Sequence, residues 1–201
     1  MCGIFGYVGN RNDAGKIVIE GLKNLEYRGY DSWGVATKTE HDGLHVRKDI
    51  GKISDVRTDD FTETSSLAIA HTRWATHGGV TQINAHPHLS EDRQIAVVHN
   101  GIVENYEELR AELKKKGHTF LSETDTEVIP HLIEEELKKS GDFAAAVRLA
   151  CAHFDGRYAI LALHTASNTL VAARTGSPLI VGVMKGSYFI ASDIPDRKSV
   201  V

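Results

Sequence analysis

Cys2 is the residue of this sequence with the most direct chemical use. It follows the initiator Met1, and a small second residue generally permits removal of that methionine. The first residue would then carry both a thiol and an α-amine, whose pKa values are normally about 8.5 and about 7.7–8.0. At neutral pH part of the amine is uncharged and can accept the thiol proton, so Cys2 could attack a carbonyl without a separate histidine. A cysteine at this position is more often incidental, so the hypothesis depends on the other motifs.

A second group of polar residues surrounds Arg73. Residues 71–78 (HTRWATHG) leave an expected strand and enter a glycine-rich turn, where polar side chains can converge on a ligand. The planar guanidinium of Arg73 suits a carboxylate, and Thr76 and His77 add hydrogen-bonding groups. Asp125 could hold an ammonium group, although a carboxylate at this position also suits a helix cap. Arg73 and Asp125 together would match the two charged ends of an α-amino acid.

Asn100 and Gly101 follow an apolar segment, residues 95–99. An asparagine side chain and a glycine backbone N–H can donate two hydrogen bonds to the oxyanion that forms when an amide carbonyl is attacked. An Asn-Gly pair alone more often marks a turn. Its position after an expected buried strand makes an oxyanion hole the functional hypothesis.

Several histidines lie between these motifs and raise the question of a zinc site. The histidines concerned are His71, His77, His86, His88 and His99. They include no His-x-x-x-His pair with an adjacent glutamate, and residues 86–88 fit a turn equally well, so we predict no metal site and favour hydrogen-bonding roles. Cys151 lies on an apolar helical stripe and is predicted to be a core residue.

Strands and helices are expected to alternate along the chain without a linker, a repeat or a low-complexity stretch. The hydrophobic pattern predicts strands over residues 4–8, 33–37, 44–48, 67–71, 95–99, 158–164, 169–173, 179–184 and 188–191. It predicts helices capped by Asp13 and stopped by Gly29, over 106–116 before Gly117, over about 124–140 before Gly141, and over 142–154. Pro130 is expected to distort the first turns of the third helix. Strands on both sides of a helical block indicate a single α+β domain with partly antiparallel sheets.

The composition is that of an ordinary globular protein. The 201 residues carry 23 Lys and Arg against 27 Asp and Glu, so no basic surface for nucleic acid is indicated. No apolar run reaches the ~18 residues of a membrane span, and residues 3–8 lack the basic flank of a signal peptide. Two cysteines suit a reducing compartment. We therefore expect a cytoplasmic protein without nucleic-acid or membrane partners.

Taken together, the motifs form a longer ordered pattern. It consists of residues 1–4, 25–32, 71–78, 84–88, 99–105 and 123–129. The pattern resembles the class II glutamine amidotransferases, which are N-terminal nucleophile hydrolases with a four-layer αββα sandwich. Within that family, residues 27–32 and 71–78 are most similar to members that make glucosamine 6-phosphate in hexosamine biosynthesis. The resemblance extends to about Asp193, so residues 1–195 are expected to form a glutaminase domain and 196–201 a short tail.

The resemblance implies a role for each candidate residue. Cys2 would be the nucleophile with its own α-amine as base, and Asn100 and Gly101 would form the oxyanion hole. The glutamine substrate would be bound by Arg73 and Thr76 at the α-carboxylate, by Asp125 at the α-amine, and by Trp74 and His77 along the loop. Arg28 and His86 would support the site. The family usually has a small residue where this chain has Trp33, so packing near Arg28 is expected to differ.

The activity that the resemblance implies is hydrolysis of L-glutamine to glutamate and ammonia through a γ-glutamyl thioester on Cys2, without a cofactor or metal. In the intact family members, ammonia would pass to a C-terminal isomerase domain that binds fructose 6-phosphate, a domain not expected in this sequence, and the full-length protein can be a homodimer. Two alternatives stay open. The chain could be the glutaminase domain of another class II amidotransferase, or a catalytically silent module that binds glutamine through Arg73 and Asp125.

Overall fold

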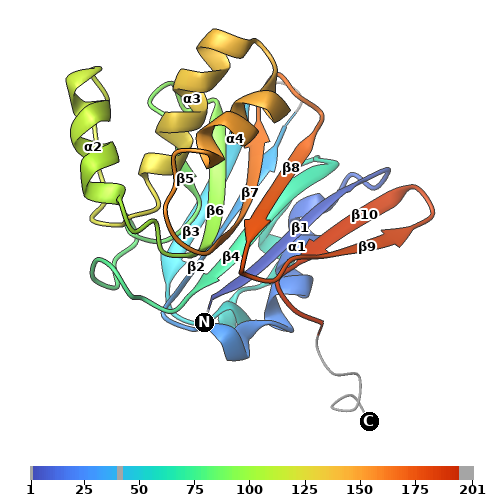
Figure 1. Ribbon diagram of the computed structural model, residues 1–201. Coiled ribbons are helices and arrows are strands. Elements are labelled where there is room, and N and C mark those ends of the chain that lie inside the picture. The colour runs from blue at the N-terminus through green and yellow to red at the C-terminus, as the bar shows by residue number, and fades with distance from the viewer. Residues whose placement is uncertain (1, 40–42, 195–201) are drawn as a thin grey trace.

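Two antiparallel β-sheets, packed face to face, form the centre of the molecule (Figure 1). The computed structural model describes residues 2–39 and 43–194. The strands are β1 (Gly3–Gly9), β2 (Ser32–Lys38), β3 (Leu44–Ile50), β4 (Leu67–Arg73), β5 (His88–Leu89), β6 (Ile95–Gly101), β7 (Tyr158–His164), β8 (Leu170–Thr175), β9 (Ile180–Met184) and β10 (Ser187–Ala191). One sheet has the strand order β3-β2-β4-β1-β10-β9 and the other β5-β6-β7-β8.

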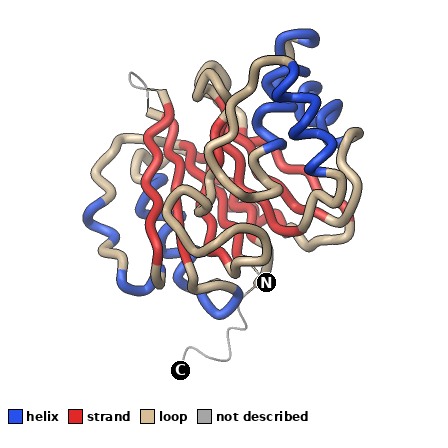
Figure 2. Tube along the Cα trace, turned by 90° about the vertical axis from the view of Figure 1, so that its left-hand side faces the viewer, coloured by secondary structure: helices blue, strands red, loops and turns tan. Residues whose placement is uncertain are grey.

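Helices cover the outer faces of both sheets. They are α1 (Ala14–Lys23), α2 (Tyr106–Lys115), α3 (Val128–Ser140) and α4 (Phe143–Cys151), with 3₁₀ helices η1 (Glu26–Arg28), η2 (Ile53–Asp55) and η3 (Thr58–Asp60). Helix α1 packs on β1 and β4 of the six-stranded sheet, whereas α3 and α4 pack on the four-stranded sheet. Figure 2 shows the two sheets between these helical layers. The predicted four-layer αββα sandwich is therefore confirmed.

Side chains of successive residues point to opposite faces of each sheet, and both faces are buried. In β1, Ile4 and Val8 face the other sheet, while Phe5 and Tyr7 face α1. In β7, Leu161 faces the six-stranded sheet, and its sequence neighbours face the helices. Successive side chains of a strand point to opposite faces, so a strand between two apolar layers needs a nearly continuous apolar sequence.

Several element boundaries differ from the sequence prediction. Helix α1 ends at Lys23 and η1 follows it, so Gly29 ends the 3₁₀ helix instead. The Asp13 side chain does not cap α1, because its carboxylate pairs with Arg11. Helix α3 begins at Val128, so the predicted distortion at Pro130 was wrong: a first-turn residue has no intrahelical N–H bond to lose.

Other details of packing complete the layers. Strand β5 was missed because it is only two residues long. Cys151 is half-buried against the core under α4, close to the core position predicted for it. Trp33 packs edge-on against Phe61 with ring centroids 6.4 Å apart, in the core beneath α1.

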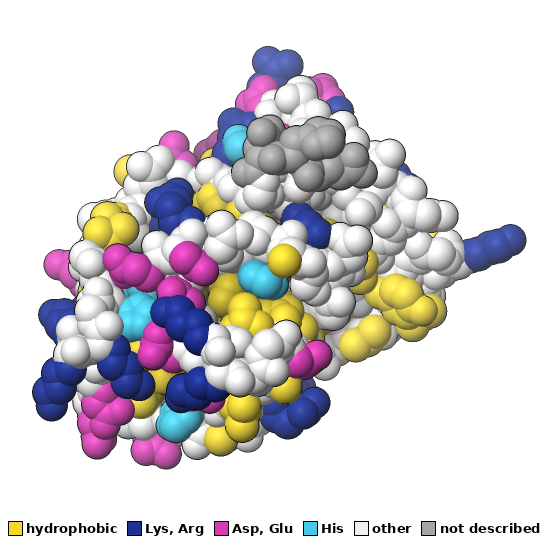
Figure 3. Space-filling view, turned by 90° about the horizontal axis from the view of Figure 1, so that it is seen from above, with side chains coloured by type: hydrophobic (Ala, Val, Ile, Leu, Met, Phe, Trp, Pro, Cys, Tyr) yellow, Lys and Arg dark blue, Asp and Glu magenta, His cyan; other side chains and the backbone are white. Residues whose placement is uncertain are grey.

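The surface has mixed charge. Seen from above, acidic and basic side chains lie next to one another with apolar atoms between them (Figure 3). The ion pairs that Lys138 makes with Glu134 and Glu135 along α3 are an example. No helix within the described residues is long and apolar enough to cross a bilayer.

Candidate active site

Three strand ends bring the predicted site residues together. Strand β1 pairs antiparallel with β4, with Gly3 opposite Thr72, so Cys2 lies beside Arg73. Strand β6 of the other sheet packs against β1 and β4 and ends at Asn100 and Gly101. Residues almost 100 positions apart in the sequence therefore meet at one edge of the sandwich.

The thiol of Cys2 lies against the start of the loop of residues 74–79. The Trp74 backbone N–H donates to Cys2 Sγ at 3.2 Å, and Sγ lies 3.6 Å from the Trp74 carbonyl oxygen. Burial raises the pKa of the Cys2 thiol, with the Trp74 N–H acting in the opposite direction. The thiol is therefore protonated at neutral pH and needs a base before it can attack.

The carbonyl group of Cys2 is held from two sides. Arg28 Nε and Asn100 Nδ2 each donate to the Cys2 carbonyl oxygen at 3.0 Å. Arg28 is buried and also pairs with Asp193 at 2.7 Å, and Tyr27 donates to the same carboxylate at 2.7 Å. These contacts fix the backbone that carries the thiol. The second N–H of the Asn100 amide is left for a ligand.

His71 sets the orientation of Asn100. Its Nε2 lies 2.9 Å from the His99 carbonyl oxygen and 3.1 Å from Asn100 Oδ1. Both of these atoms are acceptors, so Nε2 must carry the proton. Burial lowers the pKa of His71 to about 3, so the ring is neutral at physiological pH. The contact holds Oδ1 of Asn100 away from Cys2 and directs the amide nitrogen toward it.

Gly101 occupies a position that other residues would not tolerate. Its φ is +128°, and a Cβ added there would lie 2.1 Å from the Arg157 carbonyl oxygen. Only glycine adopts this backbone conformation readily, and the contact with β7 leaves no space for a side chain. The glycine thus allows β6 to end with its backbone beside the pocket that contains Cys2.

Arg73 organises the 74–79 loop. Its guanidinium donates to the carbonyl oxygens of Gly79 at 3.0 Å, Gly78 at 3.3 Å and His77. A guanidinium has five N–H donors, so donors remain for a ligand carboxylate. Asp31 anchors the start of the loop, since its carboxylate accepts from the Ala75 N–H at 2.8 Å.

A small cavity joins the predicted residues. It is lined by Cys2, Arg73, Trp74, Thr76, His77, His86, His99, Gly101, Thr124, Asp125 and Thr126. Asp125 is buried, and its Oδ2 accepts from the Val103 N–H at 2.9 Å. The volume is about 20 Å³, room for about one water molecule.

The histidines considered as zinc ligands divide into two groups. His86 stacks on His71 with ring centroids 4.1 Å apart, and its Nδ1 accepts from the His99 N–H at 3.2 Å. His88 contacts Thr124, whereas His77 lies apart beside Tyr106. The described residues do not place these five side chains around a common point for a metal ion.

Sequence reasoning gave no positioning role to three residues of this site. The sequence indicates His71 only as part of the 71–78 motif and as one of several histidines, Asp31 only as part of the 25–32 motif, and Asp193 only as the end of the resemblance. The Arg28–Asp193 pair joins residues 165 positions apart, and the Asp31 contact with Ala75 spans 44. Such contacts depend on the fold and have no local signal in the sequence.

Comparison with known proteins identifies the family. The glutamine amidotransferase domain family matches residues 71–196. Glutamine–fructose-6-phosphate aminotransferase (isomerizing) of Streptomyces coelicolor is 50% identical over 198 residues, covering 96% of this chain and 32% of that protein. The protein of the same name from Thermus thermophilus is 51% identical, covering 97% of this chain and 32% of its own length. The chain thus spans about a third of the length of these relatives.

A solved structure shows the same fold. The glutamine phosphoribosylpyrophosphate amidotransferase of B. subtilis, in complex with ADP and GMP, superposes with a TM-score of 0.78 at 29% identity. The match covers 95% of this chain and 42% of that one. The resemblance inferred from the motifs is confirmed by both comparisons. The chain belongs to the glutamine amidotransferase domain family, in its N-terminal nucleophile hydrolase class.

Proposed function

We propose that this chain hydrolyses L-glutamine to glutamate and ammonia, with Cys2 as the nucleophile after removal of Met1. The observation that carries the proposal is the single pocket in which Cys2, Arg73 and Asp125 meet Gly101, with Asn100 bound to the Cys2 carbonyl. A thiol beside an oxyanion hole suits the side-chain amide of glutamine, and the opposite charges of Arg73 and Asp125 suit its α-carboxylate and α-ammonium group.

Binding would require the 74–79 loop to move. The cavity of about 20 Å³ is too small for glutamine, and Arg73 is engaged by the loop carbonyls. Trp74 is exposed, and Thr76 is exposed next to it, so this loop can shift without opening the core. The substrate carboxylate would then take the remaining Arg73 donors with help from Thr76. The ammonium group of the substrate would pair with the Asp125 carboxylate, and Trp74 and His77 would cover the bound glutamine.

The chemistry follows from these positions. The α-amine of Cys2 accepts the thiol proton as sulfur attacks the amide carbon of glutamine. The oxyanion is stabilised by Asn100 Nδ2 and the Gly101 N–H. The protonated amine then gives its proton to the departing nitrogen, ammonia leaves, and a γ-glutamyl thioester remains. Water, deprotonated by the same amine, attacks the thioester and releases glutamate with the thiol restored.

The transfer step is proposed from the relatives. The two aminotransferases compared above are named for fructose 6-phosphate, so we infer that the ammonia serves to make glucosamine 6-phosphate in a longer protein with an isomerase domain, with residues 1–195 as its glutaminase domain. A cytoplasmic location fits this activity, because the Cys2 thiol must stay reduced and both cysteines are free thiols in the structure.

The test is the intact mass of the purified chain before and after treatment with a diazo-ketone analogue of glutamine. We expect loss of the Met1 mass and one adduct, prevented by excess glutamine. Cys2→Ala should abolish both the adduct and glutamate release. Cys151→Ala is the matched control and should retain both, because Cys151 is the last residue of α4 and does not line the pocket that contains Cys2.

The same experiment separates the alternatives. Glutamine binding without an adduct, on a chain that has lost Met1, would indicate a silent binding module. Unchanged glutamate release by Cys2→Ala would refute the proposal. Another ammonia acceptor would leave every result of this experiment the same, because glutamine hydrolysis does not depend on which molecule receives the ammonia.

A further inference from the structure

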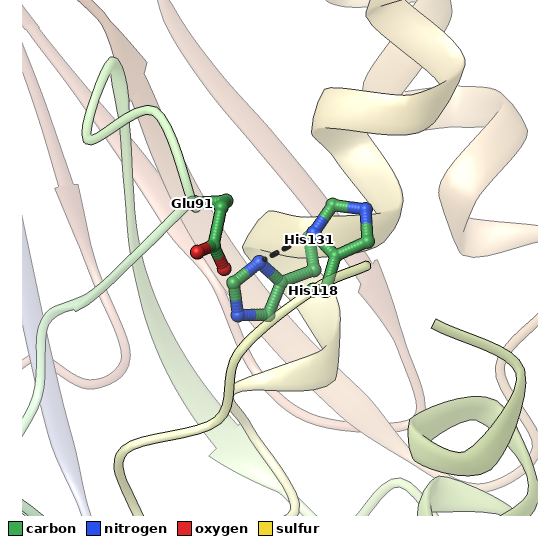
Figure 4. A group of neighbouring side chains, drawn as sticks. All are labelled: Glu91, His118 and His131. Atoms are coloured by element: carbon green, nitrogen blue, oxygen red, sulfur yellow. Dashed lines mark hydrogen bonds between the residues drawn. The ribbon is translucent and has the colours of Figure 1, made fainter. Parts of the chain in front are cut away.

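A second cluster of chemically useful side chains lies outside the glutamine pocket. Glu91 follows β5, His118 follows α2, and His131 is in the second turn of α3. One ligand atom from each of the three lies within 4.8 Å of the others. Figure 4 shows the carboxylate and the two imidazole rings turned toward one another. Neither the family comparison nor the proposed reaction uses these residues.

The hydrogen bonds of His118 prepare one of its nitrogens as a ligand. Its Nε2 lies 3.2 Å from Glu135 Oε1, an acceptor, so Nε2 carries the proton in the neutral ring. Nδ1 is then a bare lone pair, and it faces His131 Nδ1 at 3.1 Å. A carboxylate behind the distal nitrogen is the arrangement that orients metal-binding histidines in proteins.

His131 is incompletely satisfied in the described structure. Its ring is 2% exposed, and Nε2 is buried with no hydrogen-bond partner. Because His118 Nδ1 is an acceptor, His131 Nδ1 carries the proton of the contact between the two rings. An ion bound to both Nδ1 atoms would replace that proton, and the ring proton of His131 would then lie on Nε2.

The spacing suits a single small cation. Two nitrogens bound tetrahedrally to one zinc ion at about 2.0–2.1 Å would be ~3.3 Å apart. The observed separation of the facing His118 and His131 nitrogens is 3.1 Å. Glu91 supplies the third ligand, and its carboxylate accepts a hydrogen bond from the Thr119 N–H at 2.7 Å.

An ion can reach this cluster from solvent. Glu91 is exposed, and Glu91 and His131 lie on the wall of a groove of about 720 Å³ between β3 and the loop after β5. The groove shares no lining residue with the pocket that contains Cys2. A ligand here would therefore not occupy the glutamine site, and water from the groove could complete the coordination.

We propose that Glu91, His118 and His131 bind one divalent transition-metal ion of the zinc class, with Glu135 as the residue that positions His118. Two imidazole nitrogens and one carboxylate form a donor set that zinc accepts, with the fourth position left to water. The site joins the loop after β5, the turn after α2 and the start of α3, so the ion would link three segments of the chain.

The test is a titration of the untagged 201-residue chain with Zn²⁺ by calorimetry and with Co²⁺ by visible absorption. The Cys2→Ser background removes the thiol as a competing ligand. We expect one ion per chain and a Co²⁺ ligand-field band of tetrahedral intensity. Glu91→Gln and His118→Gln should each raise the dissociation constant at least about tenfold, and Glu135→Gln should raise it by ~10-fold through loss of orientation.

His153→Gln is the matched control, since His153 is an exposed histidine near Glu136. This variant should bind the ion with the same affinity as the Cys2→Ser parent. Circular dichroism spectra and unfolding midpoints show that each variant is folded. Glu91→Gln is the key variant, because its side chain is exposed and glutamine can still accept the Thr119 hydrogen bond. Either no saturable binding or binding that survives both ligand substitutions would overturn the assignment.

Discussion

At the scale of single residues, Asn100 connects the segment that carries the Cys2 nucleophile with the proposed oxyanion hole. Its amide nitrogen holds the Cys2 carbonyl, and its amide oxygen is held by His71. The side chain therefore cannot rotate freely, and its remaining N–H has a fixed direction. An oxyanion hole is effective when its donors are in place before charge develops.

We expect Asn100→Ala to lower kcat for glutamine hydrolysis by ~10²–10³ with a smaller change in KM, because the lost donor acts on the transition state. Glutamate release under saturating glutamine measures this. Asn24→Ala is the control, because Asn24 is exposed at the end of α1, its side chain donates to the Glu20 carbonyl oxygen, and it does not line the pocket that contains Cys2. A loss of less than tenfold for Asn100→Ala would show that its amide does not stabilise the oxyanion.

The chemically distinctive residues of the site were predictable from the sequence, whereas the residues that position them were not. Cys2, Arg73 and Asp125 have side chains whose charge or nucleophilicity suggests a use wherever they lie, and the structure places them around one pocket. His71 and Asp193 act through Asn100 and Arg28, respectively. That kind of role is defined by a neighbour in space, so no local pattern indicates it.

At the scale of elements, the site depends on how strand β6 ends. Gly101 has a φ of +128° and lies against the Arg157 carbonyl, whereas Gly117 has a φ of +100° with nothing within 4 Å of an added Cβ. The two glycines therefore share a strained backbone conformation but differ in available space. Alanine substitutions at these two positions therefore separate the free-energy cost of the backbone conformation from the cost of the steric contact.

We expect Gly101→Ala to destabilise the chain by more than Gly117→Ala, whose cost should be about 1–3 kcal/mol from backbone strain alone. The extra loss arises because β6 and β7 must separate to accommodate the Cβ. Urea unfolding measures both variants, and glutaminase activity should fall only for Gly101→Ala. Equal losses of stability would mean that the β6–β7 contact is easily relieved.

The buried histidines on β4, β5 and β6 and before β5 predict a loss of stability in mild acid. Burial lowers the pKa of His71 to about 3 and that of His99 to about 4, and it lowers those of His86 and His88 well below the usual value. Below pH ~6.5 the unfolded chain therefore binds protons that the folded chain does not. Stability must fall as the pH falls through this window.

Each such histidine contributes up to ~1.4 kcal/mol per pH unit between pH ~6.5 and 5. Urea unfolding at pH 7, 6 and 5 measures the slope, and His99→Gln should make it shallower by one histidine's share. Equal stability at pH 7 and pH 5 would show that these rings take up protons in the folded state.

The element pattern was mostly predictable because alternation and apolar stripes are local signals. All strands of both sheets except the two-residue β5, and the four helices, were predicted, with errors at their ends. Two errors lie at helix ends. The 3₁₀ helix η1 follows α1, and α3 begins at Val128 and not at about residue 124, where polar and acidic residues suggested a helix start. The pairing order β3-β2-β4-β1-β10-β9 was not predictable, since β1 and β10 pair across almost the whole chain.

At the scale of the whole molecule, the residues proposed for glutamine hydrolysis gather at one edge of the sandwich. The chain corresponds to about a third of the length of the aminotransferases that it resembles. Glutamine hydrolysis needs only residues of the described pocket, whereas amination of a sugar phosphate needs a second binding site and a route for ammonia between the two.

We therefore expect the 201-residue chain, given glutamine labelled with ¹⁵N in the amide, to release glutamate and labelled ammonia in equal amounts whether or not fructose 6-phosphate is present. Mass spectrometry of the products should show no labelled glucosamine 6-phosphate, because ammonia leaves the thioester step directly into solvent. The full-length Thermus thermophilus aminotransferase serves as the positive control. Labelled amino sugar from this chain alone would place an acceptor site within its own 201 residues, and the groove beside Glu91 would then be the first place to look.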